Sequence, residues 1–220
     1  MSQLDPNRRF QFALDRARTD WSAADPARCA ALAGCALSPC CAVAQHGVIV
    51  PFFGRPHVVT HPDGDVVVVN PMGAVNPAHV EEPPRDAHVS IQIVLLHHLL
   101  TADGTPSADR WLAFRELPDG LFYAQAFAGH AEGLLAEKLG ANLAGFRRVA
   151  ESLGGSPLDL ANAAYRFQAF PRLAVAALLW EGDEDFPAQA RILFDAHAGH
   201  YLPTEDLAGI GDWLAHHLIR

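Results

Sequence analysis

Apolar residues recur every three or four positions in several parts of the chain, and this spacing predicts amphipathic helices. The first such stretch covers residues 7–21, and its apolar face consists of Phe10, Leu14, Ala17 and Trp21. The same spacing predicts helices over residues 26–32, 87–100, 130–153 with a break at Gly140, and from 204 to the end of the chain. The 87–100 helix is apolar around most of its circumference, so we expect it to be buried on most sides.

Other stretches consist of β-branched and apolar residues between turn signals, which predicts strands. Residues 47–54, 56–60 and 66–69 form three such runs, separated by turn residues as in an antiparallel meander. Further strands are predicted over residues 111–115, 164–170, 173–180 and 191–195. An acidic turn joins the strands 173–180 and 191–195, which predicts a hairpin.

This order of elements predicts an α+β fold with a mostly antiparallel sheet packed by helices. We expect the 220 residues to form a single domain, with a helical N-terminal segment (1–45) and a core (46–220). Capping residues support three of the helix ends: Asp25 before Pro26, Gly34 after the second helix, and Thr204 before the last helix.

The composition excludes some classes of protein. Lys and Arg number 16 against 25 Asp and Glu, a net charge of −9, so general nucleic-acid binding is not expected. No apolar run reaches the roughly 18 residues that a membrane span needs. The first residues carry no secretory signal pattern, and we therefore expect a cytoplasmic protein.

The four cysteines leave two interpretations open. They are Cys29, Cys35, Cys40 and Cys41, and they lack the C-x2-C units of zinc and iron–sulfur sites. One interpretation is a metal or redox role; the other is that they are small buried residues in an alanine-rich segment. Signatures for nucleotide binding, for nucleophilic serine hydrolases, for zinc proteases and for covalent haem attachment are absent from the sequence.

The segment 195–201 carries the strongest candidate chemistry. His197 and His200 lie three residues apart after Asp195, at the end of a predicted strand, and Tyr201 follows. Imidazoles with a carboxylate suit zinc, iron or a haem-like centre, and Tyr201 is a candidate proton donor. The alternative is a hydrogen-bonded loop that connects the hairpin to the last helix.

Two further groups are weaker candidates. The acidic turn with Asp183 is either a cation site or a solvated hairpin tip. His97 shares a helix stripe with Ser90 and Thr101 and is a candidate to line a pocket. The more usual role for His97 or His98 is a neutral, hydrogen-bonded histidine inside the core.

Several segments resemble the family called DUF3786. They are Phe53-Gly-Arg-Pro, His98-Leu-Leu-Thr-Ala-Asp-Gly-Thr-Pro, Trp111-Leu-Ala-Phe-Arg-Glu-Leu-Pro-Asp-Gly, Leu153-Gly-Gly, Trp180-Glu-Gly-Asp-Glu-Asp-Phe-Pro, Ile192-Leu-Phe-Asp-Ala and His200-Tyr-Leu-Pro-Thr-Glu-Asp-Leu. Some members resemble fusions with an iron–sulfur domain of corrinoid-protein type, which implies association with redox metals or tetrapyrroles. The cysteine spacing here departs from that iron–sulfur pattern. His197 is not part of the matching segments.

Together these observations predict a cytoplasmic binding or accessory protein for a metal-containing cofactor, such as haem or a corrinoid, with a redox or one-carbon-metabolism protein as a further partner. We expect its pocket between the 87–100 helix and the C-terminal hairpin. The candidate residues are His200 as metal ligand with His197 as a second one, Tyr201 and Asp195 beside them, Arg115 as a carboxylate clamp, and His97. Two alternatives stay open: a small hydrolase or transferase with Asp183 or Asp195 and His200 as acid–base groups, and an interaction protein without a ligand.

Overall fold

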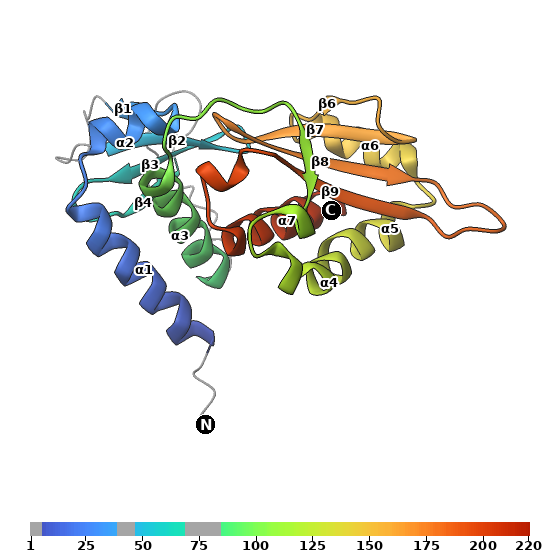
Figure 1. Ribbon diagram of the computed structural model, residues 1–220, viewed down its shortest axis with the longest axis horizontal. Helices are drawn as coiled ribbons and strands as arrows, with labels where there is room; N and C mark the ends of the chain where they lie inside the picture. Colours follow the sequence, from blue (N-terminus) through green and yellow to red (C-terminus); the bar gives the residue numbers. More distant parts are fainter. Residues whose placement is uncertain (1–5, 39–46, 69–84) are drawn as a thin grey trace. The chain divides into compact units, whose positions relative to one another are not determined.

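The computed structural model describes residues 6–38, 47–68 and 85–220. The chain divides into two compact units: unit 1 comprises Met1–Thr105 with His200–Leu202, and unit 2 comprises Pro106–Gly199 with Pro203–Arg220. Each unit contains its own antiparallel sheet with helices packed on it, as Figure 1 shows, so the predicted α+β class is confirmed. Within the described residues no helix has both the length and the apolar character that a membrane crossing needs.

Unit 1 is built on a four-stranded sheet with the order β1-β2-β3-β4. The strands β2 (Gly47–Phe52), β3 (Arg55–Thr60) and β4 (Val66–Val68) form the predicted meander, with every pair antiparallel. Strand β1 (Ala36–Ser38) pairs with β2 and was not predicted, because three residues are too few to show an alternating pattern. The helices of unit 1 are α1 (Pro6–Ser22), α2 (Pro26–Ala33) and α3 (Arg85–Thr101).

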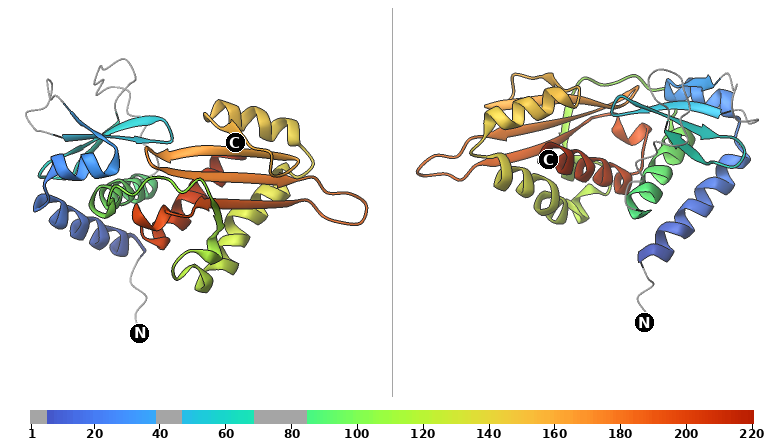
Figure 2. Two further views of the ribbon diagram at one scale, coloured as in Figure 1. Left: turned by 45° about the horizontal axis from the view of Figure 1, so that its top comes forward. Right: turned by 180° about the vertical axis from the view of Figure 1, so that it is seen from behind.

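Helices α1 and α3 lie side by side in unit 1 (Figures 1 and 2). Leu14, Ala17 and Trp21 form the buried face of α1, as predicted, whereas Phe10 is 44% exposed. The indole Nε1 of Trp21 donates a hydrogen bond of 2.8 Å to the carbonyl oxygen of Thr60, which fixes α1 to the end of β3.

The predicted ends of α2 are confirmed. The carboxylate of Asp25 accepts hydrogen bonds from the backbone nitrogens of Ala27 and Arg28, at 3.0 and 3.4 Å. Gly34 ends the helix with φ of +71°, a left-handed conformation that glycine adopts without a steric penalty.

Unit 2 is built on a five-stranded sheet with the order β5-β9-β8-β7-β6. Its strands are β5 (Trp111–Ala113), β6 (Ser156–Pro157), β7 (Ala163–Phe170), β8 (Leu173–Trp180) and β9 (Gln189–Asp195). The predicted β8–β9 hairpin is confirmed, and its tip projects beyond the other strands in Figure 1. All residues of β8 except Trp180 are buried, which explains its unbroken apolar sequence.

The helical part of unit 2 starts earlier than the sequence predicts. Its segments are η1 (Phe114–Glu116), η2 (Gly120–Phe122), α4 (Ala124–Phe127), the π-helix η3 (Ala128–Gly133), α5 (Leu134–Leu139), α6 (Leu143–Ser152) and α7 (Thr204–Leu218). The short segment η4 (Ala198–His200) starts in unit 2, and its last residue belongs to unit 1. The predicted break at Gly140 is confirmed, since α5 ends one residue before it. The π-helix interrupts the 3.6-residue period, and the sequence pattern therefore missed the turns before residue 130.

The prediction that Thr204 is the N-cap of the last helix is wrong. Thr204 is the first residue of α7 and Pro203 takes the N-cap position. The Thr204 hydroxyl donates a 2.6 Å hydrogen bond to the carbonyl oxygen of Pro118, so it is engaged away from the helix end. The predicted stripe of Leu207, Ile210, Leu214 and Leu218 is buried as expected.

Aromatic rings join the helices of unit 2 to its sheet. The rings of Phe114 and Phe127 stack with centroids 4.4 Å apart, and both contact the ring of Phe194 on β9 at 6.0 Å. Gly211 lets α7 approach this cluster closely, since a Cβ at this position would lie 2.6 Å from the Phe127 ring. In Figures 1 and 2 the segments α4, α5 and α7 accordingly lie next to one another.

Candidate functional site

His200 contacts a carboxylate that the sequence did not single out. Asp103 follows α3, and its Oδ2 lies 2.7 Å from Nδ1 of His200, the last residue of η4. Both residues belong to unit 1, and their side chains are 49% and 45% exposed. Because a carboxylate only accepts hydrogen bonds, Nδ1 of His200 donates to Asp103, and in the neutral form of the ring the lone pair is on Nε2.

Thr105 completes the environment of this pair. Its backbone nitrogen donates a 2.9 Å hydrogen bond to Oδ1 of Asp103, and its Oγ1 lies 3.3 Å from Nδ1 of His200. The hydrogen bond from His200, followed by those from Thr105, holds the pKa of Asp103 well below its ordinary value. Asp103 therefore stays ionised at neutral pH. We call Asp103, Thr105, His200 and Tyr201 the His200 site.

Tyr201 anchors the segment that carries His200. Its side chain is fully buried, and its hydroxyl donates a hydrogen bond to the carbonyl oxygen of Thr105. Its ring stacks on the buried ring of His98, with centroids 5.7 Å apart and 28° between the planes. The phenol thus faces the interior of unit 1, next to the half-exposed imidazole of His200.

His98 is a neutral histidine in the core of unit 1. Burial lowers its pKa from 6.5 to about 3, although hydrogen bonds to the backbone of Tyr201 and Ala33 oppose this shift in part. His98 therefore matches the core role that the sequence suggested for one of the two histidines of α3. The neighbouring His97, a candidate for the pocket, is only half-buried on the same helix.

Asp195 is found in unit 2, where it organises a turn. Its Oδ1 accepts hydrogen bonds from the backbone nitrogens of Ala108 (3.0 Å) and His197 (2.9 Å). Its Oδ2 accepts from the Ser107 hydroxyl (2.6 Å) and from the backbone nitrogen of Asp109 (3.1 Å). We call these five residues the Asp195 turn.

The electrostatics of the Asp195 turn keep its carboxylate charged. Burial by itself would raise the pKa of Asp195, which is 2% exposed, but the hydrogen bonds from Ser107 and from the three backbone nitrogens lower it overall. The ring Nδ1 of His197 lies 2.9 Å from the carbonyl oxygen of Pro106. These contacts hold the 106–109 loop on the end of β9.

The other predicted residues lie elsewhere. Arg115 is exposed on η1 of unit 2. Asp183 closes the hairpin tip, where its Oδ1 accepts from the backbone nitrogens of Asp185 and Phe186 at 2.9 and 2.7 Å. Within residues 6–38, 47–68 and 85–220 no three His, Cys, Asp or Glu side chains are grouped to hold a metal ion.

Two of the four cysteines can be placed. Cys29 and Cys35 are half-buried thiols of unit 1, and burial raises the pKa of the Cys29 thiol, which makes it less reactive at neutral pH. Cys40 and Cys41 lie outside the described residues.

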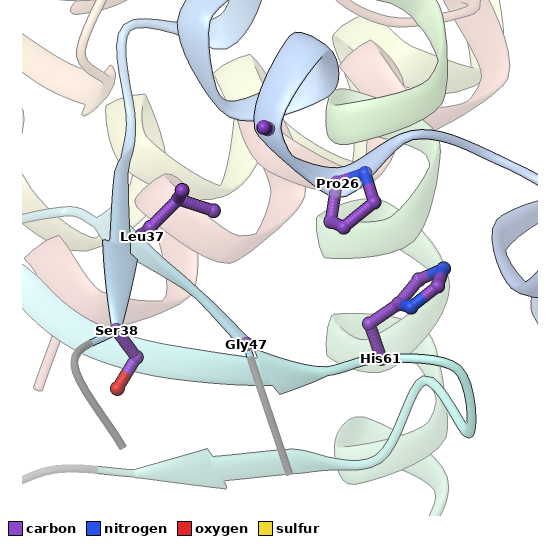
Figure 3. A pocket seen from close by; sticks show the side chains of 6 residues that line it. Pro26, Leu37, Ser38, Gly47 and His61 are labelled. Carbon is purple, nitrogen blue, oxygen red and sulfur yellow. The ribbon is translucent and has the colours of Figure 1, made fainter.

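Unit 1 also has a surface pocket, shown in Figure 3. It has a volume of about 320 Å³ and is lined by Pro26, Ala27, Leu37, Ser38, Gly47 and His61. None of the residues predicted as functional lines it.

The sequence named His200 and Tyr201 but missed Asp103 and Thr105, which are about 95 positions away along the chain. One sequence signal could have linked the two pairs of residues: both lie in segments that resemble the same family, residues 98–106 and 200–207.

Comparison with known proteins identifies the family. No curated protein and no solved structure matches the chain. The model of the DUF3786 family, described as a domain of unknown function, matches residues 25–217. This match covers nearly the whole chain, including both the His200 site and the Asp195 turn, and the chain therefore belongs to the DUF3786 family.

Proposed function

We propose that this protein is a cytoplasmic binding or accessory protein for a metal-containing cofactor, a tetrapyrrole such as haem or a corrinoid, with His200 as the ligand that the chain supplies. The observation that carries this proposal is the 2.7 Å contact between Asp103 and His200. A histidine that binds a metal usually donates its other ring N–H to a carboxylate or carbonyl, which fixes the tautomer and makes the binding nitrogen more basic. Asp103 fulfils this role for His200.

The chemistry of the donor set favours a tetrapyrrole over a bare metal ion. A macrocycle brings its own nitrogen ligands, so a single histidine of the protein is enough to hold its metal. His200 is such a single histidine, and its half-exposed ring is accessible from solvent. An accessible ligand suits a protein that takes up a cofactor and passes it to a redox or one-carbon-metabolism protein.

The test is a titration of the purified protein with hemin and, separately, with hydroxocobalamin, followed by absorption spectroscopy. We expect the wild type to give the spectral change of histidine ligation with at least one of the two compounds, and His200→Ala to abolish it. Asp103→Asn keeps the shape of the side chain but removes its charge, and we expect it to weaken binding about 10–100-fold.

His197→Ala is the matched control. His197 is the other histidine of the same segment, but its Nδ1 contacts the Pro106 carbonyl in unit 2. We expect this variant to bind like the wild type. Identical spectra for the wild type and His200→Ala with both compounds would overturn the proposal.

The same contact supports a second candidate function, a small hydrolase or transferase. A carboxylate that orients an imidazole is the arrangement of a general base. Asp103 is the carboxylate that contacts His200, whereas Asp183 and Asp195 accept hydrogen bonds within unit 2, so the acid–base partner of His200 in this candidate is Asp103. Hydrolysis of p-nitrophenyl acetate at equal rates by the wild type and His200→Ala would eliminate it.

A further inference from the structure

Unit 2 contains a second group of titratable side chains, outside the Asp195 turn. Tyr123 directly precedes α4, His130 lies in the π-helix η3, and Asp212 and His216 lie one turn apart on α7. The helices η3 and α7 pack against each other, which brings these residues of separate segments together. None of them was predicted from the sequence.

Tyr123 and His130 form the accessible part of this group. The Tyr123 hydroxyl lies 3.4 Å from Nδ1 of His130, and the two rings meet edge to face with centroids 6.3 Å apart. Tyr123 is 43% exposed and His130 is also exposed. The contact is longer than an ordinary hydrogen bond, as contacts between catalytic groups often are before substrate binds.

Asp212, which is half-buried, forms the less accessible part. Its Oδ1 is shielded from solvent, and no hydrogen-bond donor in the described part of the chain reaches it. Burial raises the pKa of Asp212, while the nearby His130 and His216 act to lower it. A carboxylate in this position is stabilised by positive charge close by. Asp212 can therefore stabilise positive charge that develops on the facing segment η3, which packs against α7.

The π-helix holds His130 in a defined position. Glu132 of the same segment is buried and accepts hydrogen bonds from Nη1 of Arg191 (2.9 Å) and from the backbone nitrogen of Ile192 (3.1 Å) on β9. These bonds fix η3 to the sheet through Glu132, two residues after the exposed His130. Single π-turns of this kind occur frequently at functional sites.

We propose that Tyr123, His130 and Asp212 form a second reactive site, in which the Tyr123 oxygen is a nucleophile for an electrophilic group carried on an apolar body. In the reaction His130 accepts the phenolic proton, a bond forms between the Tyr123 oxygen and the electrophilic atom, and the leaving group departs with its electron pair. Asp212 stabilises the imidazolium that results. Leu121 and Phe122, which are 72% and 92% exposed immediately before Tyr123, offer the apolar contact.

Benzenesulfonyl fluoride is the probe that tests this proposal. Attack by the phenol forms an aryl sulfonate ester and releases fluoride, and peptide mass spectrometry locates the modified residue. We expect Tyr123 to be labelled at pH 7.5, with His130→Gln slowing the reaction at least tenfold and Asp212→Asn slowing it several-fold. The His130→Gln variant should recover its rate only as the pH approaches about 10, where an ordinary phenol ionises.

Two controls distinguish activation of the Tyr123 phenol by its neighbours from labelling that reflects only its exposure to solvent. Tyr165 and Tyr201 are buried and should stay unlabelled in the folded protein. His217→Gln removes an imidazole of the same helix as Asp212 that stacks on the Trp213 ring and is not part of this group, and should leave the rate unchanged. Equal labelling rates and pH profiles for the wild type and His130→Gln would overturn the proposal. This outcome is independent of the cofactor titration, which concerns residues of unit 1.

Discussion

Replacement of Asp195 by asparagine is expected to lower the free energy of unfolding of unit 2 by about 3–5 kcal/mol at pH 7, since hydrogen bonds to a charged group contribute about 1.5–3 kcal/mol each. Each carboxylate oxygen accepts two hydrogen bonds in the Asp195 turn. An asparagine side chain keeps one such oxygen, and its NH₂ group would face donors in place of the other. Two of these part-buried donors then lose their acceptor.

The measurement is urea denaturation followed by tryptophan fluorescence, because Trp111, Trp180 and Trp213, three of the four tryptophans, lie in unit 2. Asp183→Asn is the matched control: this exposed residue uses only Oδ1 for its two hydrogen bonds, and asparagine retains that oxygen. We expect a change within about 0.5 kcal/mol for the control. A decrease in the free energy of unfolding of less than about 1 kcal/mol for Asp195→Asn would contradict the structural role that we assign to this carboxylate.

The Asp195 effect should also depend on pH. The folded state lowers the pKa of Asp195, so its stabilisation is fully present above the unfolded value of about 3.9 and is lost as the pH falls through the folded value. The difference between the wild type and Asp195→Asn should therefore shrink in acid, where a protonated Asp195 resembles asparagine.

Acidification is expected to destabilise unit 1 through His98, by roughly 4–5 kcal/mol between pH 7 and pH 3. Burial holds the pKa of His98 at about 3, against 6.5 in the unfolded chain. Between these two pKa values His98 is protonated in the unfolded chain but not in the folded protein. The free energy of unfolding therefore falls as the pH falls. The loss begins near pH 6.5 and levels off below about pH 3.

Hydrogen exchange of the α3 amides, corrected for the intrinsic pH dependence of exchange, measures this effect within unit 1. The His98→Gln variant removes the titrating group but keeps an amide that hydrogen-bonds to a backbone carbonyl, so its opening free energy should vary much less with pH. His97→Gln, on the adjacent half-buried residue, should keep the wild-type profile. Parallel profiles for the wild type and His98→Gln would show that His98 is not the group responsible.

Local signals in the sequence were sufficient to predict most of the helices and strands. The Asp25 cap, Gly34 and the β8–β9 hairpin are set by residues that are near one another in the chain, and the structure confirms them. Thr204 carried an equally good cap signal, but its hydroxyl bonds to Pro118, 86 positions away. A tertiary contact of this kind overrides a local preference.

The candidate site shows the same difference between what local sequence predicts and what tertiary contacts decide. His200, Tyr201 and Asp195 seemed to form one group because they are close in sequence, yet the structure pairs His200 and Tyr201 with Asp103 and Thr105, and pairs Asp195 with residues 107–109. The sequence also could not decide between His97 and His98. Their helix is apolar on nearly all sides, so its pattern does not mark which of the two faces the core.

The sequence by itself determined the α+β class, the order of most of the strands and helices and the ends of several of them, because periodicity and capping act over a few residues. Only the tertiary structure decided that an exposed imidazole meets Asp103, that His98 is buried against Tyr201, and that Tyr123 contacts His130. Each of these sites joins residues from different elements of its unit. Their proximity depends on how the helices and sheets pack, which no local pattern records.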